Sequence, residues 1–245
     1  MATPMEKKDA HEVVSPAEWL AARKELLRKE KEFSRLRDEL AAQRRQLPWE
    51  KVAKQYVFEG PKGKESLAAL FDGRRQLAVY HFMLGPGWKE GCPSCSFIAD
   101  GFDGAAIHLA QRDTMLVVVS RATLGEIESF KKRMGWKFKW VSSNGSDFNF
   151  DYGVSFTKET LDKGKAVYNY TDAGADFAGE ERPGASMFCR NDAGEIFHTY
   201  STYARGLDIL LGAYNWLDMT PMGRHEEGLA HGMAWVRHHD RYPAG

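Results

Sequence analysis

The sequence predicts an α/β protein in which helices flank a central mixed sheet and a long helix precedes that sheet. Two apolar runs, residues 76–84 and 114–120, are typical of strands buried on both faces of a parallel sheet. A helical segment from Cys92 to about residue 111 lies between them, so the three form a strand–helix–strand unit with a right-handed crossover. A hairpin of residues 185–190 and 196–201 adds antiparallel strands, which makes the sheet mixed.

A helix of some thirty residues is predicted between Ser15 and Pro48. Ser15, Pro16 and Glu18 give a capping box with proline in the first turn. Apolar residues recur every seven positions and form one apolar face; they are Trp19, Leu26, Phe33, Leu40 and Leu47. We expect this face to pack on the protein's own domain or on a second subunit, which would make the protein a homo-oligomer.

The other elements follow from shorter patterns. A short strand at 56–58, a turn at 60–63 and a helical turn at 66–71 precede the first apolar run, and a helix at 124–134 and a strand at 138–142 follow the second. Residues 144–178 are rich in Gly, Asp, Asn and aromatic residues and predict an ordered excursion. An amphipathic helix at 207–217 ends the fold, and the His-rich segment after it is loop-like.

This order of elements is a thioredoxin-type layout, with an N-terminal strand and turn of the kind that peroxiredoxins and membrane-anchored thiol reductases add. The boundaries that we predict are a disordered tail at residues 1–14, an N-terminal helical extension at 15–48, a thioredoxin-like domain at 49–219 and a C-terminal loop or tail at 220–245. No internal repeat is found.

Composition excludes several classes of function. The 245 residues are 43% hydrophobic and 28% charged, as in an ordinary globular protein, and 34 basic residues balance 34 acidic ones. A chain with no net charge is not predicted to attract nucleic acid or an anionic membrane surface. The apolar runs are too short to span a bilayer, and no hydrophobic segment follows the first residues. We therefore expect a cytoplasmic protein.

The central motif is Cys92-Pro93-Ser94-Cys95, at the predicted junction of strand and helix. In a reducing compartment, two cysteines at this spacing indicate redox or metal chemistry rather than a disulfide framework. The free N–H groups at the start of a helix stabilise a thiolate and lower its pKa. We expect Cys92 to be the attacking sulfur and Cys95 the resolving one.

Several segments resemble a bacterial thioredoxin-like family catalogued as domain of unknown function 899. They are WLAAR at 19–23, RRQLP at 44–48, EGCPSCS at 90–96, ADGF at 99–102, DFN at 147–149, HTYSTYARG at 198–206 and LDMTPMGR at 217–224. The resemblance covers residues 15–240 and implies a thioredoxin-like fold. It implies no particular activity.

Comparison with thioredoxin and peroxiredoxin patterns reveals differences around the motif. Thioredoxin has Trp directly before its first Cys, where this chain has Gly91, and the nearest Trp is Trp88. Thioredoxin's cis-proline would fall near Ala185, whereas the nearest proline is Pro183. A peroxiredoxin has Thr or Ser where this chain has Lys89, which disfavours peroxidase activity.

Three residues are candidates to assist the cysteines. His81 lies in the strand before the motif, where thioredoxin buries an acid, and it could move the proton of Cys95, although a core histidine is the common alternative. Lys89 could stabilise the Cys92 thiolate by its charge, and Trp88 could contact the substrate. Cys189 is expected to be a core residue, with an extra redox role as the alternative.

A metal site is not predicted, because no second Cys-x-x-Cys is present and the spacing of the tail histidines His231, His238 and His239 indicates none. The leading hypothesis is a thiol-disulfide oxidoreductase or thiol-dependent reductase without a bound cofactor. Its partners would be a dithiol electron donor such as thioredoxin and an oxidised thiol or disulfide substrate. The alternatives are a non-catalytic thioredoxin-fold interaction module and, third, a peroxiredoxin-like peroxidase.

Overall fold

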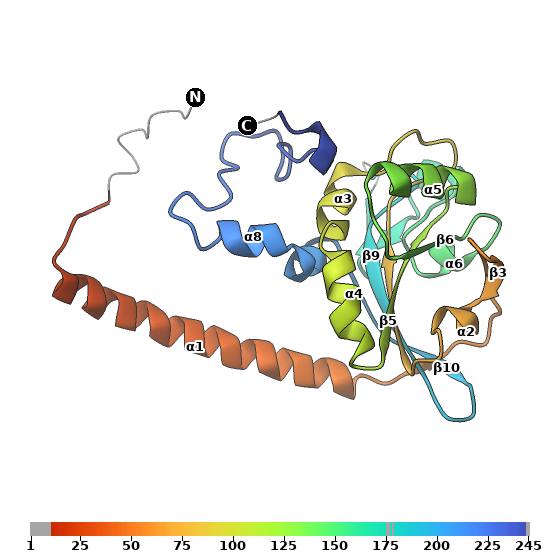
Figure 1. Ribbon diagram of the computed structural model, residues 1–245, viewed down its shortest axis with the longest axis horizontal. Helices are drawn as coiled ribbons and strands as arrows, with labels where there is room; N and C mark the ends of the chain where they lie inside the picture. Colours follow the sequence, from red (N-terminus) through yellow and green to blue (C-terminus); the bar gives the residue numbers. More distant parts are fainter. Residues whose placement is uncertain (1–10, 175–176, 178, 244–245) are drawn as a thin grey trace. The chain divides into compact units, whose positions relative to one another are not determined.

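The computed structural model describes residues 11–174, 177 and 179–243, and the chain divides into two compact units, residues 1–47 and 48–245 (Figure 1). The predicted disordered tail at 1–14 lies mostly outside the described residues, and residues 11–15 form no regular structure. The described part of the chain contains no helix that is both long enough and apolar enough to cross a membrane.

The first unit is the helix α1 (Pro16–Gln46), which begins and ends where the sequence predicts. The capping box is present, since Ser15 N–H donates to the Glu18 carboxylate at 2.9 Å and Glu18 N–H donates to Ser15 Oγ at 3.4 Å. No residue of α1 is buried, and its apolar face is exposed, with Trp19 at 59% and Phe33 at 65%. Among the described residues of this unit, the helix therefore has end caps and surface ion pairs but no core of its own.

The second unit is built on one eight-stranded mixed sheet in the order β1-β10-β9-β4-β5-β6-β2-β3. The strands are β1 (Glu50–Lys51), β2 (Val57–Gly60), β3 (Gly63–Ser66), β4 (Gln76–His81), β5 (Thr114–Ser120), β6 (Lys139–Ser142), β9 (Gly184–Arg190) and β10 (Ile196–Tyr203). A separate pair consists of β7 (Val167–Tyr168) and β8 (Thr171–Asp172). Strands β4, β5 and β6 are parallel, and β9 is antiparallel to both β4 and β10.

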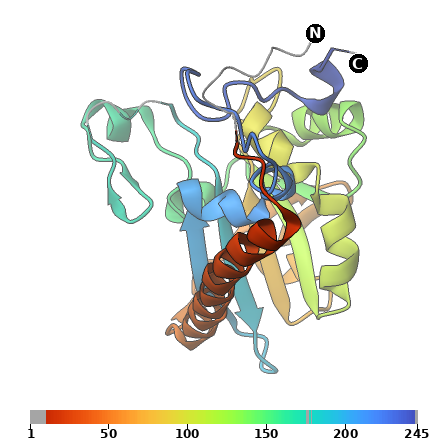
Figure 2. The ribbon, with the colours of Figure 1, turned by 90° about the vertical axis from the view of Figure 1, so that its left-hand side faces the viewer.

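The predicted strand–helix–strand unit is β4, α3 (Pro93–Ala99), α4 (Phe102–Ala110) and β5. The predicted hairpin is β9–β10, which lies beside β4 in Figure 2. Together they give the thioredoxin-like fold that the order of elements predicts. The first strand is shorter than expected, because β4 ends at His81 rather than at residue 84.

Helices cover both faces of the sheet, and each face has its own core. The first core contains residues of α3, α4, α5 (Leu124–Arg133), the 3-10 helix η2 (Ala204–Leu210) and α8 (Gly212–Leu217). The second contains residues of α2 (Leu67–Leu70) and α6 (Phe148–Asp151). Cys95 belongs to the first core, so this face carries the predicted redox site.

Three predicted segments differ in detail. The helix expected from Cys92 to about residue 111 is divided at Gly101 into α3 and α4, and the helix expected at 207–217 is divided at Leu211 into η2 and α8. The excursion at 144–178 contains α6, α7 (Lys158–Asp162) and the pair β7–β8. The C-terminal segment consists mostly of turns with the short 3-10 helix η3 (His239–Arg241), yet it belongs to the second unit and buries Val236 and His238.

Candidate functional site

The two cysteines lie where the chain leaves the end of β4 and enters α3. After His81 the backbone continues beside β5 for one residue, since Phe82 N–H donates to the Val119 carbonyl at 2.9 Å. Cys92 is the N-cap residue of α3, Pro93 follows in the first turn, and the Cys92 N–H donates to the Met83 carbonyl at 3.0 Å. The first thiol is thereby fixed between the end of a buried strand and the start of a helix.

The two thiols have opposite environments. Cys92 is partly exposed, whereas Cys95 is 1% exposed, and both are free. A hydrogen bond from the Cys95 thiol, together with hydrogen bonds from the N–H groups of Cys95 and Ser94 and the Ser94 hydroxyl, lowers the pKa of Cys92 to about 6 despite partial burial. Burial and the adjacent Cys92 sulfur raise the pKa of Cys95 above its ordinary value. At neutral pH the accessible sulfur is therefore the thiolate and the buried one the thiol.

Two polar groups stand beside the Cys95 sulfur. The Tyr80 hydroxyl and the Met83 N–H both lower the pKa of Cys95, although less than burial raises it. The Tyr80 hydroxyl is itself buried and makes no hydrogen bond of standard geometry within the described residues. Burial raises the pKa of Tyr80 and the charge of Cys95 raises it further. The Tyr80 hydroxyl is thus a neutral donor available to the second sulfur.

The residue before the motif must be small. A Cβ atom at Gly91 would lie 2.4 Å from a ring carbon of Phe82 and 2.8 Å from a ring carbon of Phe130. Such distances are far shorter than a carbon–carbon contact, so a side chain here would displace two buried rings. This packing explains why Gly91 stands where thioredoxin has Trp.

His81 does not reach the cysteines. Neighbouring residues of a strand point to opposite faces of the sheet, and Tyr80 faces Cys95. The His81 ring instead lies near Phe148 and Tyr152 on the other face, and its Nε2 is 2.8 Å from Ser186 Oγ. Burial lowers the pKa of His81 to about 3, so the ring is neutral. The place that we predicted for His81 is occupied by Tyr80.

The other residues considered in the sequence analysis are Lys89, Trp88, Pro183 and Cys189. Lys89 is exposed, and Trp88 is 39% exposed with its indole nitrogen folded back over Gly85. Pro183 directly precedes β9, which begins at Gly184 rather than at Ala185 as we expected, and no peptide bond in the described residues is cis. Cys189 is a half-buried residue near the far end of β9.

A metal centre has no support among the described residues, where no group of three or more His, Cys, Asp or Glu side chains comes together. The tail histidines have separate partners. His231 lies against its neighbouring Gly232 carbonyl, His238 against the Gly91 carbonyl and His239 against Asp100.

Sequence reasoning missed three residues near the motif. Tyr80 is next to His81, and strand alternation alone does not tell which of the two faces the cysteines. Tyr168 comes from the excursion at 144–178. Its hydroxyl donates to the Pro183 carbonyl at 2.8 Å, and burial, with a smaller contribution from the charge of Cys95, raises its pKa. His238 was expected to lie in a loose tail.

Comparisons with known proteins identify the family. A model described as "Bacterial protein of unknown function (DUF899)" matches residues 8–242. The chain belongs to this family. No curated protein matches the chain.

Solved structures that this DUF899 member resembles include peroxidoxin BcpB from Mycobacterium tuberculosis, with 12% identity, coverage of 67% of this chain and 94% of that one, and a TM-score of 0.45. Peroxiredoxin Q from Xanthomonas campestris is 16% identical, with coverage of 68% of this chain and 95% of that one and a TM-score of 0.43. A proposed thiol:disulfide interchange protein, DsbE, from Chlorobium tepidum is 11% identical, with coverage of 68% of this chain and 99% of that one and a TM-score of 0.40. Likenesses of this size do not specify an activity.

Proposed function

We propose that the protein is a thiol-disulfide oxidoreductase or thiol-dependent reductase whose reacting groups are Cys92 and Cys95. The observation that supports this proposal best is the asymmetry of the pair: an accessible sulfur with a pKa of about 6 beside a buried sulfur with a raised pKa. Such a pair has one sulfur suited to attack and a second that stays protonated until the first has reacted.

In the first step the Cys92 thiolate attacks one sulfur of a substrate disulfide. A bond forms between Cys92 Sγ and that sulfur, the substrate S–S bond breaks, and the second substrate sulfur leaves as a thiolate that takes up a proton. An oxidised thiol such as a sulfenic acid would react in the same way, with water as the leaving group after protonation. Either reaction leaves Cys92 in a mixed disulfide.

In the second step Cys95 resolves the mixed disulfide. The hydrogen bond to Cys92 and the charge of Cys92 both raise the pKa of Cys95, and both disappear when Cys92 becomes a neutral disulfide. The Tyr80 hydroxyl and the Met83 N–H remain to stabilise the Cys95 thiolate as it forms. Cys95 then attacks Cys92 Sγ, the substrate leaves as a thiol with the proton that Cys95 lost, and a Cys92–Cys95 disulfide remains.

The cycle closes when a dithiol donor such as thioredoxin supplies two electrons and two protons to this disulfide. The sulfur chemistry needs no bound cofactor. We place the reaction in the cytoplasm, where such donors keep thiols reduced. We also propose that the apolar face of α1 joins two copies of the chain, because it repeats every seven residues and is exposed along its length.

Insulin reduction in the presence of a dithiol donor tests the proposal, with Cys92→Ser as the inactive control. A Cys95→Ser variant should accumulate the mixed disulfide, since the resolving sulfur is absent. Turnover of hydrogen peroxide that depends on Cys92, without disulfide reduction, would indicate the peroxidase instead. Absence of both activities with an ordinary Cys92 thiol would contradict the proposal and favour an interaction module.

A further inference from the structure

The end of the chain lies against the loop that precedes the cysteines. Val236 is 3% exposed and His238 is 4% exposed, and the His238 ring packs edge-on against Phe130 with 5.3 Å between ring centres. Phe130 is one of the two rings that leave no space for a side chain at Gly91. The C-terminal segment, the ring of Phe130 and the loop that contains Gly91 therefore form one packed group.

The hydrogen bonds of His238 define its protonation. Its Nδ1 is 3.1 Å from Nη2 of Arg133, and a guanidinium only donates, so Nδ1 accepts. The ring's hydrogen is then on Nε2, which is 2.8 Å from the Gly91 carbonyl oxygen and donates to it. A neutral His238 is consequently bonded on both sides, with one bond reaching the residue next to Cys92.

The peptide between Gly91 and Cys92 is held at both ends. Its carbonyl accepts from His238, and its N–H donates to the Met83 carbonyl at 3.0 Å. This peptide fixes the backbone of Cys92, the N-cap residue of α3, and with it the position of Sγ relative to the N–H groups of Ser94 and Cys95. Those N–H groups stabilise a thiolate only while they point at it.

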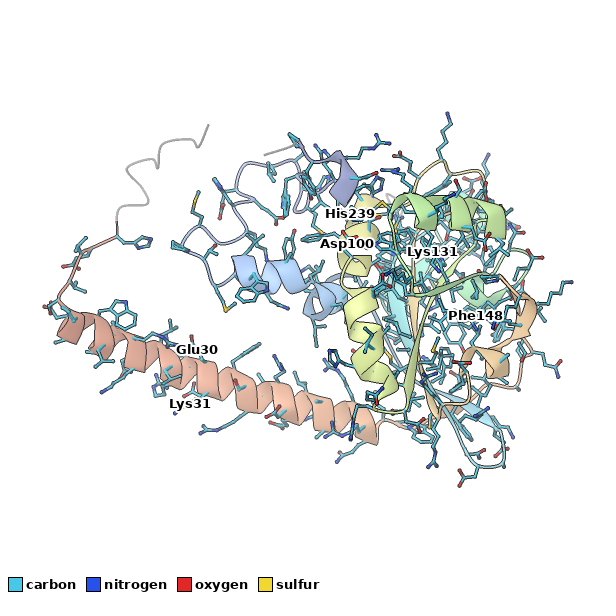
Figure 3. All side chains as sticks on the ribbon, viewed as in Figure 1. Glu30, Lys31, Asp100, Lys131, Phe148 and His239 are labelled. Atoms are coloured by element: carbon cyan, nitrogen blue, oxygen red, sulfur yellow. The ribbon has the colours of Figure 1, made fainter. Side chains whose placement is uncertain are left out.

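Polar contacts, some between charged groups, fix the C-terminal segment on both sides of α3. Arg133 makes two bonds of 2.8 Å to the Asp240 carboxylate and one of 2.7 Å to Glu90, the residue before Gly91. Beyond the other end of α3, His239 Nδ1 is 2.7 Å from Asp100 Oδ1, and these two side chains are labelled side by side in Figure 3. The C-terminal segment therefore extends along α3 and contacts the chain both before the start of this helix and at its end.

We propose that His238 is a positioning residue for the Cys92 thiolate. By holding the Gly91 carbonyl, its Nε2–H keeps Cys92 Sγ aligned with the N–H groups that stabilise the charged sulfur. The proposal rests on the redox function of Cys92 and deepens it: the C-terminal segment is part of the redox site, and a chain that lacks it has a less acidic Cys92.

Two substitutions separate the hydrogen bond from the packing. His238→Phe keeps a ring against Phe130 but has no donor, whereas His238→Gln keeps an N–H donor on a side chain of similar reach. His231→Phe is the control, because it changes an exposed histidine of the same segment that bonds to the neighbouring Gly232 carbonyl and not to the loop. All three are made in the full chain with Cys189→Ser, and thermal unfolding establishes that each is folded.

The measurement is the pH profile of iodoacetamide alkylation at Cys92, followed by mass spectrometry. We expect His238→Phe to move the midpoint upward by about one pH unit, while His238→Gln and His231→Phe stay near the parent. An unchanged midpoint in folded His238→Phe, or an equal shift in His238→Gln and His238→Phe, would overturn the proposal. The parent profile separately tests the redox function, which an ordinary thiol midpoint would contradict.

Nuclear magnetic resonance of nitrogen-15-labelled histidine keeps the test decisive if His238→Phe does not fold. The parent protein should show His238 as the neutral form with its hydrogen on Nε2. A ring with its hydrogen on Nδ1 and none on Nε2 could not donate to the Gly91 carbonyl or accept from Arg133, and would overturn the proposal.

Discussion

The acidity of Cys92 should depend chiefly on Cys95, because the hydrogen bond from the Cys95 thiol is the largest influence that lowers the Cys92 pKa. Cys95→Ala removes that donor and leaves the N–H groups of α3 in place. A hydrogen bond to a charged group contributes about 1.5–3 kcal/mol, and about 1.36 kcal/mol corresponds to one pKa unit. We therefore expect the pKa of Cys92 to rise from about 6 by about one to two units.

The assay is the rate of iodoacetamide alkylation at Cys92 as a function of pH, in a Cys189→Ser background. Two changes should appear together. The midpoint moves upward, and the plateau rate at high pH rises about fivefold for a shift of about 1.5 units, since a more basic thiolate is a better nucleophile. Cys95→Ser, whose hydroxyl can still donate, should shift the midpoint less. A midpoint that is the same in all three proteins would refute the assigned cause of the low pKa.

Three further predictions concern the loop, the second core and the long helix. Gly91→Ala should lower the free energy of urea unfolding by about 1–3 kcal/mol, because the added Cβ clashes with two rings. Gly104 has open space around it, so Gly104→Ala should be neutral or stabilising. Equal effects of the two substitutions would contradict the packing around Gly91. His81 has a pKa of about 3 in the folded state against an ordinary value of 6.5, so its contribution to the free energy of unfolding is complete above about pH 6.5 and is lost as the pH falls toward 3. At about pH 5 the protein should have lost about 2 kcal/mol of stability from this group. His81→Gln should lack this loss, and identical pH dependence of unfolding in both proteins would refute a buried neutral imidazole. Aspartate at both Leu26 and Phe33 should reduce the mass in light scattering to that of one chain, whereas an unchanged assembly would exclude α1 as the interface.

The fold was predictable because its main signals are local. Each of these signals is contained in a few consecutive residues: the apolar runs of β4 and β5, the turn of the β9–β10 hairpin, and the capping box of α1. The edge strand β1 has only two residues, both exposed, and such a strand leaves no apolar pattern to detect. The family was recognisable from short segments distributed over nearly the whole chain.

The surroundings of the cysteines were less predictable, because they depend on contacts between distant segments. Tyr80 and His81 are adjacent, and the choice between them depends on which face of the sheet α3 covers. His238 reaches Gly91 across 147 positions of sequence. A histidine that follows turns and lies between Arg237 and His239 has no local signal of burial, so only the folded chain reveals it.

A redox titration determines whether Cys92 and Cys95 form a reversible redox pair. The Cys189→Ser protein is equilibrated with reduced and oxidised glutathione at a series of ratios, and the free thiols are counted by mass after alkylation. We expect both thiols to disappear together into a Cys92–Cys95 disulfide, with the potential changing by about 30 mV for each tenfold change in the ratio of oxidised to reduced protein. Two thiols that stay reduced at every ratio, or Cys92 held as a glutathione adduct beside a free Cys95, would contradict it.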